Sequence, residues 1–474
     1  MAVDLQDRSS PRPEAMPKLL AGAFAIYGLV AVALLAVTMP PFQNPDELTH
    51  FLRAAQVAEG GVIGRRFAVI RPDGTAAVTA GGRVDPALPA AARPFRPIQY
   101  DPQVKARRAM WAPRFGWSAA RAWVAFPNTA IYPPFFYLPA ALGVLAGRAA
   151  GLTVVQTLVL SRLLTGVASM AVGVAAIGCA GAAAVWLFAI LTLPMSLALI
   201  ASSSQDALML ACSALAAALL VRGMRAPWRQ GTAERACLVA VLCLVTMARP
   251  PYGGMALLPL ALPSVPLRRR LLAAGVVLAA IIAWSALAAT AALTATGVTL
   301  GGLKVDPAAQ AALLLRHPLL ALRVARTTIA SLWRVYLQGF IGWLGWLDTR
   351  LPRLYRIVAA GMLLVAAAAT MLGRGERTVG AASRLVIAAA VLSSVVAVFA
   401  IEYLTWTVPG ALVVDGVQGR YFLPLALVGG AALPALGTDR WARVRQALVL
   451  AVAAFPIVSL GIVMRAIVLR YYLS

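Results

Sequence analysis

Long apolar runs recur along the chain from Leu19 to Leu469, and several reach the roughly 20 residues that a helix needs to cross a bilayer. Apolar residues make up 61% of the 474 residues and charged residues only 12%, whereas soluble domains hold about 45–50% and about 25%. Runs such as 208–221 lack the apolar–polar alternation of transmembrane barrel strands. The sequence therefore predicts an all-α polytopic integral membrane protein with about 11–13 transmembrane helices.

The basic residues that give the chain its net charge of +25 gather in short loops between the apolar runs. This is the positive-inside pattern of membrane proteins, and it marks these loops as cytoplasmic. It favours membrane topology over nucleic-acid binding, for which the chain carries no motif. The loops contain Arg222, Arg225, Arg229 and Arg235; Arg268, Arg269 and Arg270; Arg374, Arg377 and Arg384; and Arg440, Arg443 and Arg445.

Two hydrophilic stretches interrupt a single membrane domain that runs over residues 19–470. The polar, proline-rich residues 1–18 predict a disordered cytoplasmic tail. Residues 41–130 form a long first periplasmic loop and residues 296–350 a second periplasmic segment, within which 307–345 has the pattern of interfacial helices.

The crossing count between residues 131 and 222 is not fixed by the pattern. Four apolar stretches occur where the topology requires an odd number, so one must be re-entrant, interfacial or fused with its neighbour. Further on, two short spans meet at Arg249-Pro250-Pro251, where proline blocks a continuous helix. We expect this hinge on the outer side, because basic loops flank the pair.

An unusual polar motif follows the first span directly. Asp46, His50 and Arg53 fall on one face if the segment after Pro45 is helical, with Glu47 beside them. We interpret Asp46 as a general base, Glu47 as a second catalytic acid, and His50 and Arg53 as substrate-binding residues. The alternative is helix capping, because acids in a first turn stabilise a helix by about 0.3–1 kcal/mol.

Other polar residues stand at predicted outer span ends. Asp206 opens a helix after a run of serines. Together with Asp46 and His50 it predicts a site for Mg²⁺ or Mn²⁺. The alternative is that Asp206 is only a solvated residue at the start of a helix. Arg249 and Arg420 are candidate phosphate ligands, and each has the alternative of anchoring a helix at the interface. Gln418 is a further substrate-binding candidate, Lys304 a further cation, and Gly419 allows a close backbone approach to a ligand.

Several of these segments together resemble the bacterial membrane proteins grouped as domain of unknown function 2142. The resemblance runs from about residue 20 to 465, and the combination of motifs is specific although each one alone is not. The chain departs from the family pattern in having Leu48-Thr49 before His50, Ser-Gln-Asp at Asp206, and Arg249 where a lysine is usual. The segments are Pro45-Asp46-Glu47 with His50 and Arg53, Tyr132–Tyr137, Ser204-Gln205-Asp206, Gly345–Thr349 and Gly416–Pro424.

That family is similar in layout to the C-type glycosyltransferases, which take a sugar from a polyprenyl-phosphate carrier on the outer face of the membrane. By this resemblance Asp46 corresponds to their first-loop acid and Asp206 to their second acidic site, which sometimes includes a divalent metal. The resemblance implies an inverting membrane glycosyltransferase of the bacterial inner membrane. Its partners would be the lipid bilayer, a polyprenyl-phosphate-linked sugar and a glycan or lipid acceptor of the cell envelope.

Two other classes of function stay open. A transporter or flippase of a lipid-linked glycan would use the same cations without chemistry, although transport favours charged or broken helices at the bilayer midplane. A non-catalytic membrane scaffold is the third possibility. Convergence of Asp46, Asp206 and Arg420 in one place would favour the enzyme, because reacting groups must be held close together.

Overall fold

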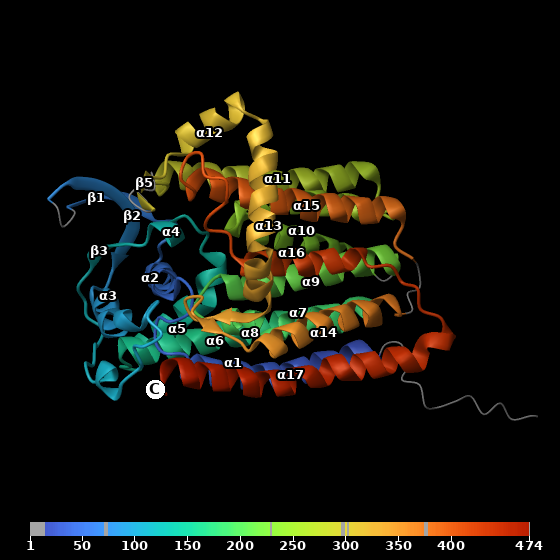
Figure 1. Ribbon diagram of the computed structural model, residues 1–474, viewed down its shortest axis with the longest axis horizontal. Coiled ribbons are helices and arrows are strands. Elements are labelled where there is room, and N and C mark those ends of the chain that lie inside the picture. Colours follow the sequence, from blue (N-terminus) through green and yellow to red (C-terminus); the bar gives the residue numbers. More distant parts are fainter. Residues whose placement is uncertain are drawn as a thin grey trace, which may run out of the picture.

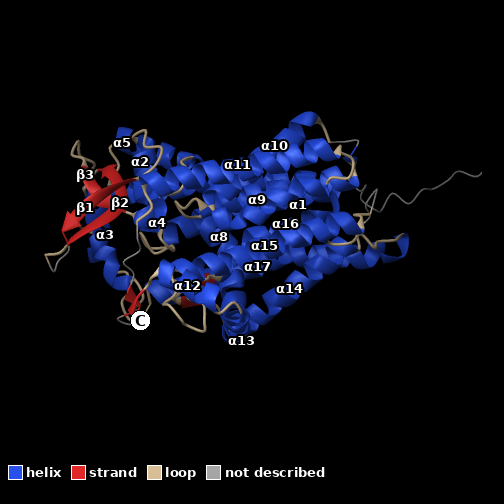
Figure 2. Ribbon diagram, turned by 90° about the horizontal axis from the view of Figure 1, so that it is seen from above, coloured by secondary structure: helices blue, strands red, loops and turns tan. Residues whose placement is uncertain are grey.

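The computed structural model describes residues 15–70, 74–227, 230–294, 299–300, 303–373 and 378–473. Within them the chain forms 17 α-helices, several short 3-10 helices and three small antiparallel sheets, which confirms the predicted all-α class. The long helices run side by side, and the largest sheet lies at one end of the bundle, here called the sheet end (Figures 1 and 2). Most of the predicted cytoplasmic tail, residues 1–14, lies outside the described residues.

Seven helices among the described residues are long and apolar enough to cross a membrane, or eight if one bent pair forms a single span. These numbers are lower than the 11–13 that the apolar runs predict, because several runs are divided by prolines or bends into shorter elements. The seven are α1 (Ala15–Thr38), α6 (Val154–Cys179), α9 (Asp206–Arg225), α11 (Leu267–Ala291), α14 (Arg353–Met371), α15 (Ala381–Thr405) and α17 (Ala442–Tyr471).

The shorter apolar elements account for the difference. The predicted span at 180–200 is bent by 80° at the break before Pro194, which makes it a candidate for the re-entrant stretch. Beyond Pro250 the chain continues as a 3-10 helix rather than an α-helix. The elements are α5 (Leu138–Ala149), α7 (Ala184–Leu191), α8 (Pro194–Ile200), α10 (Thr232–Ala248), η6 (Pro250–Ala261) and α16 (Leu423–Gly429).

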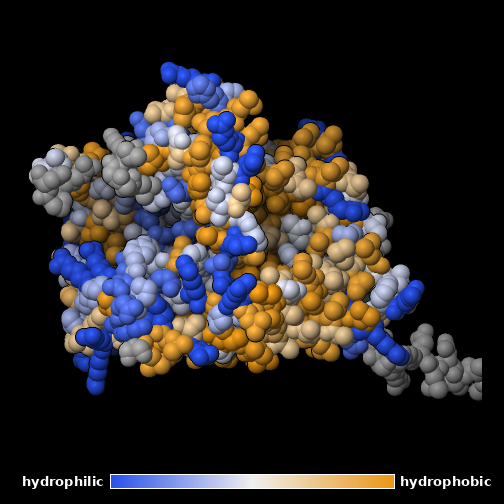
Figure 3. Space-filling model, viewed as in Figure 1, coloured by the Kyte–Doolittle hydropathy of each residue, from blue (hydrophilic) through white to orange (hydrophobic). Residues whose placement is uncertain are grey.

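Helix α9 lies in the centre of the bundle, packed against α6, α10 and α16. In its most apolar window 89% of the residues are buried within the protein, compared with 17–28% in α11, α14, α15 and α17. Those outer helices expose large apolar side chains such as Leu272, Leu364 and Leu385. Figure 3 shows apolar side chains over the flanks of the bundle and hydrophilic ones towards its ends, as expected of a surface in contact with lipid.

The first hydrophilic stretch forms a small layer over the sheet end of the bundle. Helix α2 (Glu47–Ala58) packs on α5 and on strand β2, and β2 pairs with β1 and β3 in an antiparallel sheet. The layer consists of α2, β1 (Arg65–Ile70), β2 (Ala76–Val84), α3 (Ala87–Ala92), β3 (Ala122–Ala125), α4 (Pro127–Ala130) and intervening 3-10 turns.

The second hydrophilic segment contains α12 (Pro307–Arg316) and α13 (Leu319–Gly342), where the sequence predicts interfacial helices. Helix α13 runs across the spanning helices rather than along them (Figure 1). It exposes Leu322 and Ile329 as well as Arg323, as is typical of a helix lying in the membrane interface. Short strand pairs flank the two helices: β4 (Thr299–Leu300) with β5 (Leu303–Lys304), and β6 (Trp343–Leu344) with β7 (Thr349–Arg350).

The basic loops gather at the end of the bundle opposite the sheet end. Three of the segments that end there are joined, because the Arg225 guanidinium donates to the carbonyl of Leu433 and the Leu436 amide donates to that of Met371. Helix α17, in contrast, ends at the sheet end, where the amide of Ala106 donates to the carbonyl of Tyr471. The clustering of basic loops at one end agrees with the positive-inside pattern.

Candidate functional site

Four charged side chains from four separate segments meet at the sheet end of the bundle, and we call them the charge cluster: Asp46, Asp206, Arg249 and Arg420. Arg420 donates from Nη2 to Asp46 Oδ2 at 3.0 Å, and its Nη1 lies 3.6 Å from Asp206 Oδ2. On the other side of Asp206, Oδ1 is 3.7 Å from Arg249 Nη2. The formal charges of two acids and two arginines cancel, so the ions can be held together with little net charge.

Asp46 is the accessible member of the cluster. Its side chain is 34% exposed, whereas those of Asp206 and Arg420 are 6% and 3% exposed. Its backbone is left-handed, with φ of 57°, and its carbonyl accepts hydrogen bonds from the Thr49 hydroxyl and the His50 amide. The Asp46 carboxylate makes no capping hydrogen bond to α2. Such strained backbone positions are concentrated at functional sites, and here the turn directs the carboxylate to Arg420 instead of to the helix.

The ring of Tyr421 makes cation–π contacts with both arginines of the cluster. The Arg249 guanidinium carbon lies 4.2 Å from the centre of the Tyr421 ring, and that of Arg420 lies 5.6 Å from it. The Tyr252 hydroxyl donates to the carbonyl of Tyr421 at 2.7 Å and fixes this segment against η6. The cation–π contacts and the two acids together allow two arginines to stay close in a buried place.

Several buried polar atoms around the cluster have no hydrogen-bond partner among the described residues. They include Oδ1 of Asp206, Nε and Nη1 of Arg420, and Oε1 of Gln418. Buried polar groups are normally hydrogen-bonded, so a group of unpaired donors and acceptors indicates a place where a polar ligand can bind. The substrate-binding role of Gln418, two residues before Arg420, stays a prediction.

Gly419 makes its close approach to protein rather than to a ligand. A Cβ atom at this position would overlap the backbone of α13 at Tyr336 and Phe340. The glycine thus allows η7 (Gly419–Phe422) to lie directly on α13, and this contact sets the position of Arg420.

Glu47 is not part of the charge cluster. Both its oxygens bind the guanidinium of Arg162 on α6, with Nε to Oε1 at 2.8 Å, and Oε1 also accepts from the Asn44 side-chain amide. Arg162 further donates to the carbonyls of Ala36, Met39 and Pro40, and the pair is almost completely buried. The predicted catalytic role of Glu47 is therefore not supported, because its carboxylate is fully used in joining the end of α1 to α2 and α6.

Sequence reasoning missed Arg162, although a signal was present. The residue is an arginine inside the apolar run 154–177, where an unpaired charge is costly.

Arg53 also has a structural role. Its guanidinium donates to the carbonyls of Gly61, Val62 and Tyr132 and to the side chain of Gln56. These hydrogen bonds join the loop that follows α2 to the segment that leads into α5. The donors needed for a substrate are thus already engaged, which argues against the predicted substrate-binding role.

His50 lies between the charge cluster and two tyrosines. Its Nδ1 is hydrogen-bonded to the Tyr137 hydroxyl at 2.7 Å, and its ring stacks on that of Tyr132 at 6.2 Å. Burial lowers the pKa of His50 below its ordinary value of 6.5, and the negative charges of Asp206 and Asp46 oppose this shift without cancelling it. The imidazole is therefore neutral at pH 7. Its contacts fix the positions of Tyr132 and Tyr137 beside it.

The comparison with protein families decides the relationship of this chain. A family model described as a predicted membrane protein (DUF2142) matches residues 29–428, which is more than half of the chain. The chain belongs to the DUF2142 family. No curated protein and no solved structure matches it. The charge cluster of this DUF2142 protein lies wholly inside the matched region.

The residues of this DUF2142 protein do not fit the predicted divalent metal site. Across the described parts of the chain, no group of three or more His, Cys, Asp or Glu side chains could hold a metal ion. Of the three predicted ligands, Asp46 and Asp206 face arginines and His50 uses Nδ1 for Tyr137.

The side chain of Lys304, the further predicted cation, lies outside the described residues.

A groove of about 370 Å³ has an apolar lining that includes none of the four cluster residues. Phe422, two residues after Arg420, lines it together with Trp186, Phe340, Val395 and Leu425. These side chains come from η7, α7, α13, α15 and α16, so the groove lies between helices of the DUF2142 bundle and is lined by the same short segment that carries Arg420. A hydrocarbon chain is the ligand that such a lining would favour.

Proposed function

We propose that this DUF2142 protein is a membrane glycosyltransferase that uses a polyprenyl-phosphate-linked sugar in the assembly of a cell-envelope polysaccharide or glycolipid. The observation that carries the proposal is the charge cluster. It presents one accessible carboxylate, Asp46, hydrogen-bonded to a buried arginine that stands beside a second acid and a second arginine.

The proposed reaction uses these groups in two roles. Asp46 takes the proton of the acceptor hydroxyl while the oxygen of that hydroxyl attacks the anomeric carbon of the donor sugar. The bond from that carbon to the carrier phosphate breaks, and the phosphate leaves with the electron pair. Arg420 and Arg249 stabilise the negative charge of the leaving phosphate, for which guanidinium groups are well suited. A single displacement of this kind inverts the configuration at the anomeric carbon.

Asp206 has a positioning role in this scheme. Its carboxylate lies between the two arginines and is itself almost fully buried. It would hold both guanidinium groups in place for the phosphate. When the phosphate binds Arg420, it competes with Asp46 for the same donor and so releases the carboxylate to act as a base.

The surroundings of the cluster support a lipid-linked donor. The groove that starts at Phe422 is apolar and would take the polyprenyl chain while the phosphate reaches Arg420. We propose that the sheet end faces the periplasm and that the protein lies in the bacterial inner membrane, because the arginine-rich loops gather at the opposite end.

The test is transfer of a radiolabelled sugar from polyprenyl phosphate to a lipid or glycan acceptor by membranes containing the full-length protein. D46N should abolish transfer and leave membrane insertion unchanged. D306N is the matched control, because Asp306 caps α12 far from the cluster in sequence and asparagine also caps helices. Wild-type transfer by D46N would rule the proposal out.

A transporter or flippase is the second candidate, and the 80° break before α8 favours it, because broken helices often carry the binding sites of transporters. Product analysis separates the candidates. A transporter moves the carrier-linked sugar with its glycosidic phosphate bond intact, whereas the enzyme breaks that bond. A scaffold would show neither activity, and D46N would then change nothing.

A further inference from the structure

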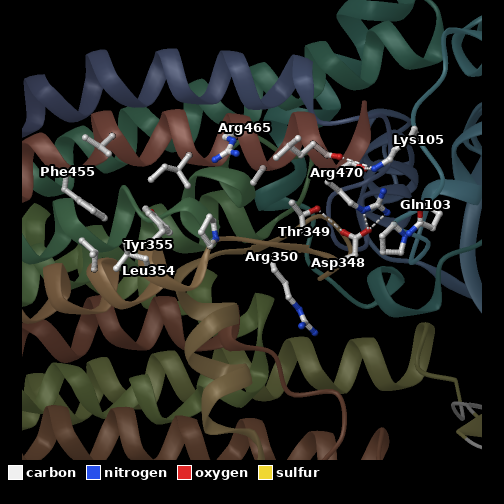
Figure 4. Close-up of a pocket in the computed structure, with 17 residues that line it drawn as sticks. Gln103, Lys105, Asp348, Thr349, Arg350, Leu354, Tyr355, Phe455, Arg465 and Arg470 are labelled. Atoms are coloured by element: carbon white, nitrogen blue, oxygen red, sulfur yellow. Dashed lines mark hydrogen bonds and ion pairs between the residues drawn. The ribbon is translucent and has the colours of Figure 1, made fainter. Parts of the chain in front are cut away.

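A second groove, of about 930 Å³, runs along the surface between α14 and α17. Figure 4 shows polar residues at one end, among them Lys105, Asp348 and Arg470, and apolar residues such as Phe455 and Leu354 at the other. The polar end is formed by loops of the sheet end and the apolar end by the flanks of two spanning helices. The groove therefore changes from hydrophilic to apolar along its length.

The apolar end faces the surface that contacts lipid. Leu354 is 73% exposed and Val458 is 64% exposed, although both line the groove. Side chains exposed to this extent on spanning helices lie against hydrocarbon in a membrane. A ligand in the groove can thus enter sideways from the bilayer.

The polar end carries an excess of positive charge. Asp348 is its single acid among the lining residues, and Arg470 binds that carboxylate through Nε at 2.9 Å and also donates to the carbonyls of Ile98 and Val104. Arg470 is thus fully engaged. Three further cations, Lys105, Arg350 and Arg465, line the groove, and the Arg350 guanidinium carbon lies 4.9 Å from the centre of the Trp343 ring.

Lys105 uses two of its three protons, which it donates to the carbonyls of Leu469 and Arg470 at 3.1 Å each. Arg465 is exposed, and within the described chain it forms no ion pair. Lys105 therefore lies at the last turn of α17, and Arg465 is one helical turn before Leu469 on that helix. Both side chains line the groove and have donors for an anionic ligand.

We propose that this groove holds an anionic glycerophospholipid of the bilayer, with its charged headgroup at the cations that line the groove, Lys105 and Arg465 among them, and an acyl chain along α14 and α17. The excess of cations selects the charged headgroup, and the apolar end accepts the chain. The proposal does not depend on the glycosyltransferase reaction.

A membrane phospholipid suits this place better than the sugar carrier, because the groove is separated from the charge cluster. The two share no lining residue, and Tyr100 and Trp346, whose rings are 5.5 Å apart, belong to neither. The Trp346 indole donates to the carbonyl of Phe42. The bound lipid would instead support the contact of residues 98–106 with the end of α17.

The experiment measures binding of fluorescent phosphatidylglycerol to the purified full-length protein in neutral detergent, with phosphatidylcholine as the uncharged comparison. Wild type should prefer phosphatidylglycerol, and R465Q should weaken that preference about fivefold, as expected for loss of one cation near an anionic phosphate. K105Q should weaken it similarly. R323Q, which removes an exposed arginine from α13, should bind as wild type does.

Three results would overturn the proposal. Equal affinity for the two phospholipids would show that charge does not select the ligand. Unchanged selectivity in R465Q and K105Q, both folded by circular dichroism, would place the lipid elsewhere. Displacement of phosphatidylglycerol from wild type, but not from R465Q, by an equal concentration of polyprenyl phosphate would assign the groove to the carrier.

Discussion

Asp46 and Arg420 are 374 positions apart in the chain and are joined by a hydrogen bond of 3.0 Å. The first belongs to a turn just after the first span and the second to a short 3-10 helix before α16. Their contact brings the accessible acid to the deepest cation of the cluster.

Replacing Arg420 by glutamine should lower the rate of sugar transfer by roughly 10²–10³, the usual effect of removing one group that stabilises charge in a transition state. The double variant D46N/R420Q should be little worse than the slower single variant, because groups that act together are strongly non-additive. Initial transfer rates measured on purified proteins check both expectations. Additive losses would mean that the two residues act independently.

Replacing Glu47 by glutamine should destabilise the protein by about 3–5 kcal/mol, because it leaves Arg162 as an uncompensated buried charge. Thermal unfolding in detergent measures the loss. A double variant with apolar residues of similar size at both positions should recover much of the stability. An E47Q protein with wild-type stability and no transfer activity would return Glu47 to a catalytic role.

The protein should become less stable as the pH is lowered, because His50 resists protonation in the folded state. Its folded pKa is lowered, so above its ordinary value of 6.5 both folded and unfolded chains are neutral there and the free energy of unfolding is unaffected. As the pH falls below 6.5, the unfolded chain binds a proton that the folded chain excludes, and stability decreases by at most about 1.4 kcal/mol per pH unit.

Melting temperatures between pH 7.5 and 5.5 test this effect of His50. H50Q should lose part of the pH dependence seen in wild type. The chain has only one other histidine, His317, which is exposed, so H317Q should retain it. A steeper dependence in H50Q than in wild type would contradict the assignment.

Replacing Gly419 by alanine should impair both folding and activity, because the new methyl group meets the α13 backbone and must displace η7. The expected cost is about 1–3 kcal/mol, with a lower transfer rate as Arg420 moves. G361A is the matched control, since a Cβ atom at Gly361 on α14 has open space around it. Unfolding temperature and transfer rate are measured together, and normal values for G419A would show that the contact is loose.

The positions of the charge cluster could be predicted from the sequence because charged residues are rare in this chain and stand at the ends of apolar runs. That rule identified Asp46, Asp206, Arg249 and Arg420 before any contact was known. It could not tell which charges face the site and which join helices. Glu47 and Arg53 have the same residue types as the cluster, and only tertiary packing turns them towards Arg162 and backbone carbonyls.

The fold class was predictable, and the number of spans was less so. An apolar run predicts that a segment is buried in lipid or in protein, but it does not predict where the helix bends. The break before Pro194 lies inside a run that reads as continuous, and the second of the two predicted short spans, after Pro250, is a 3-10 helix. The position of Gln418 and the apolar groove at Phe422 depend on contacts between distant helices, which no local pattern contains.

Asp206 is the first residue of α9, the helix that other helices surround most completely. A carboxylate at the tip of such a helix keeps its place unless the whole bundle rearranges. Asp46 and Arg420, in contrast, sit on a turn and on a short 3-10 segment. Substrate entry would therefore shift these two residues around a stationary acid, and the inner half of the protein need not change shape during turnover.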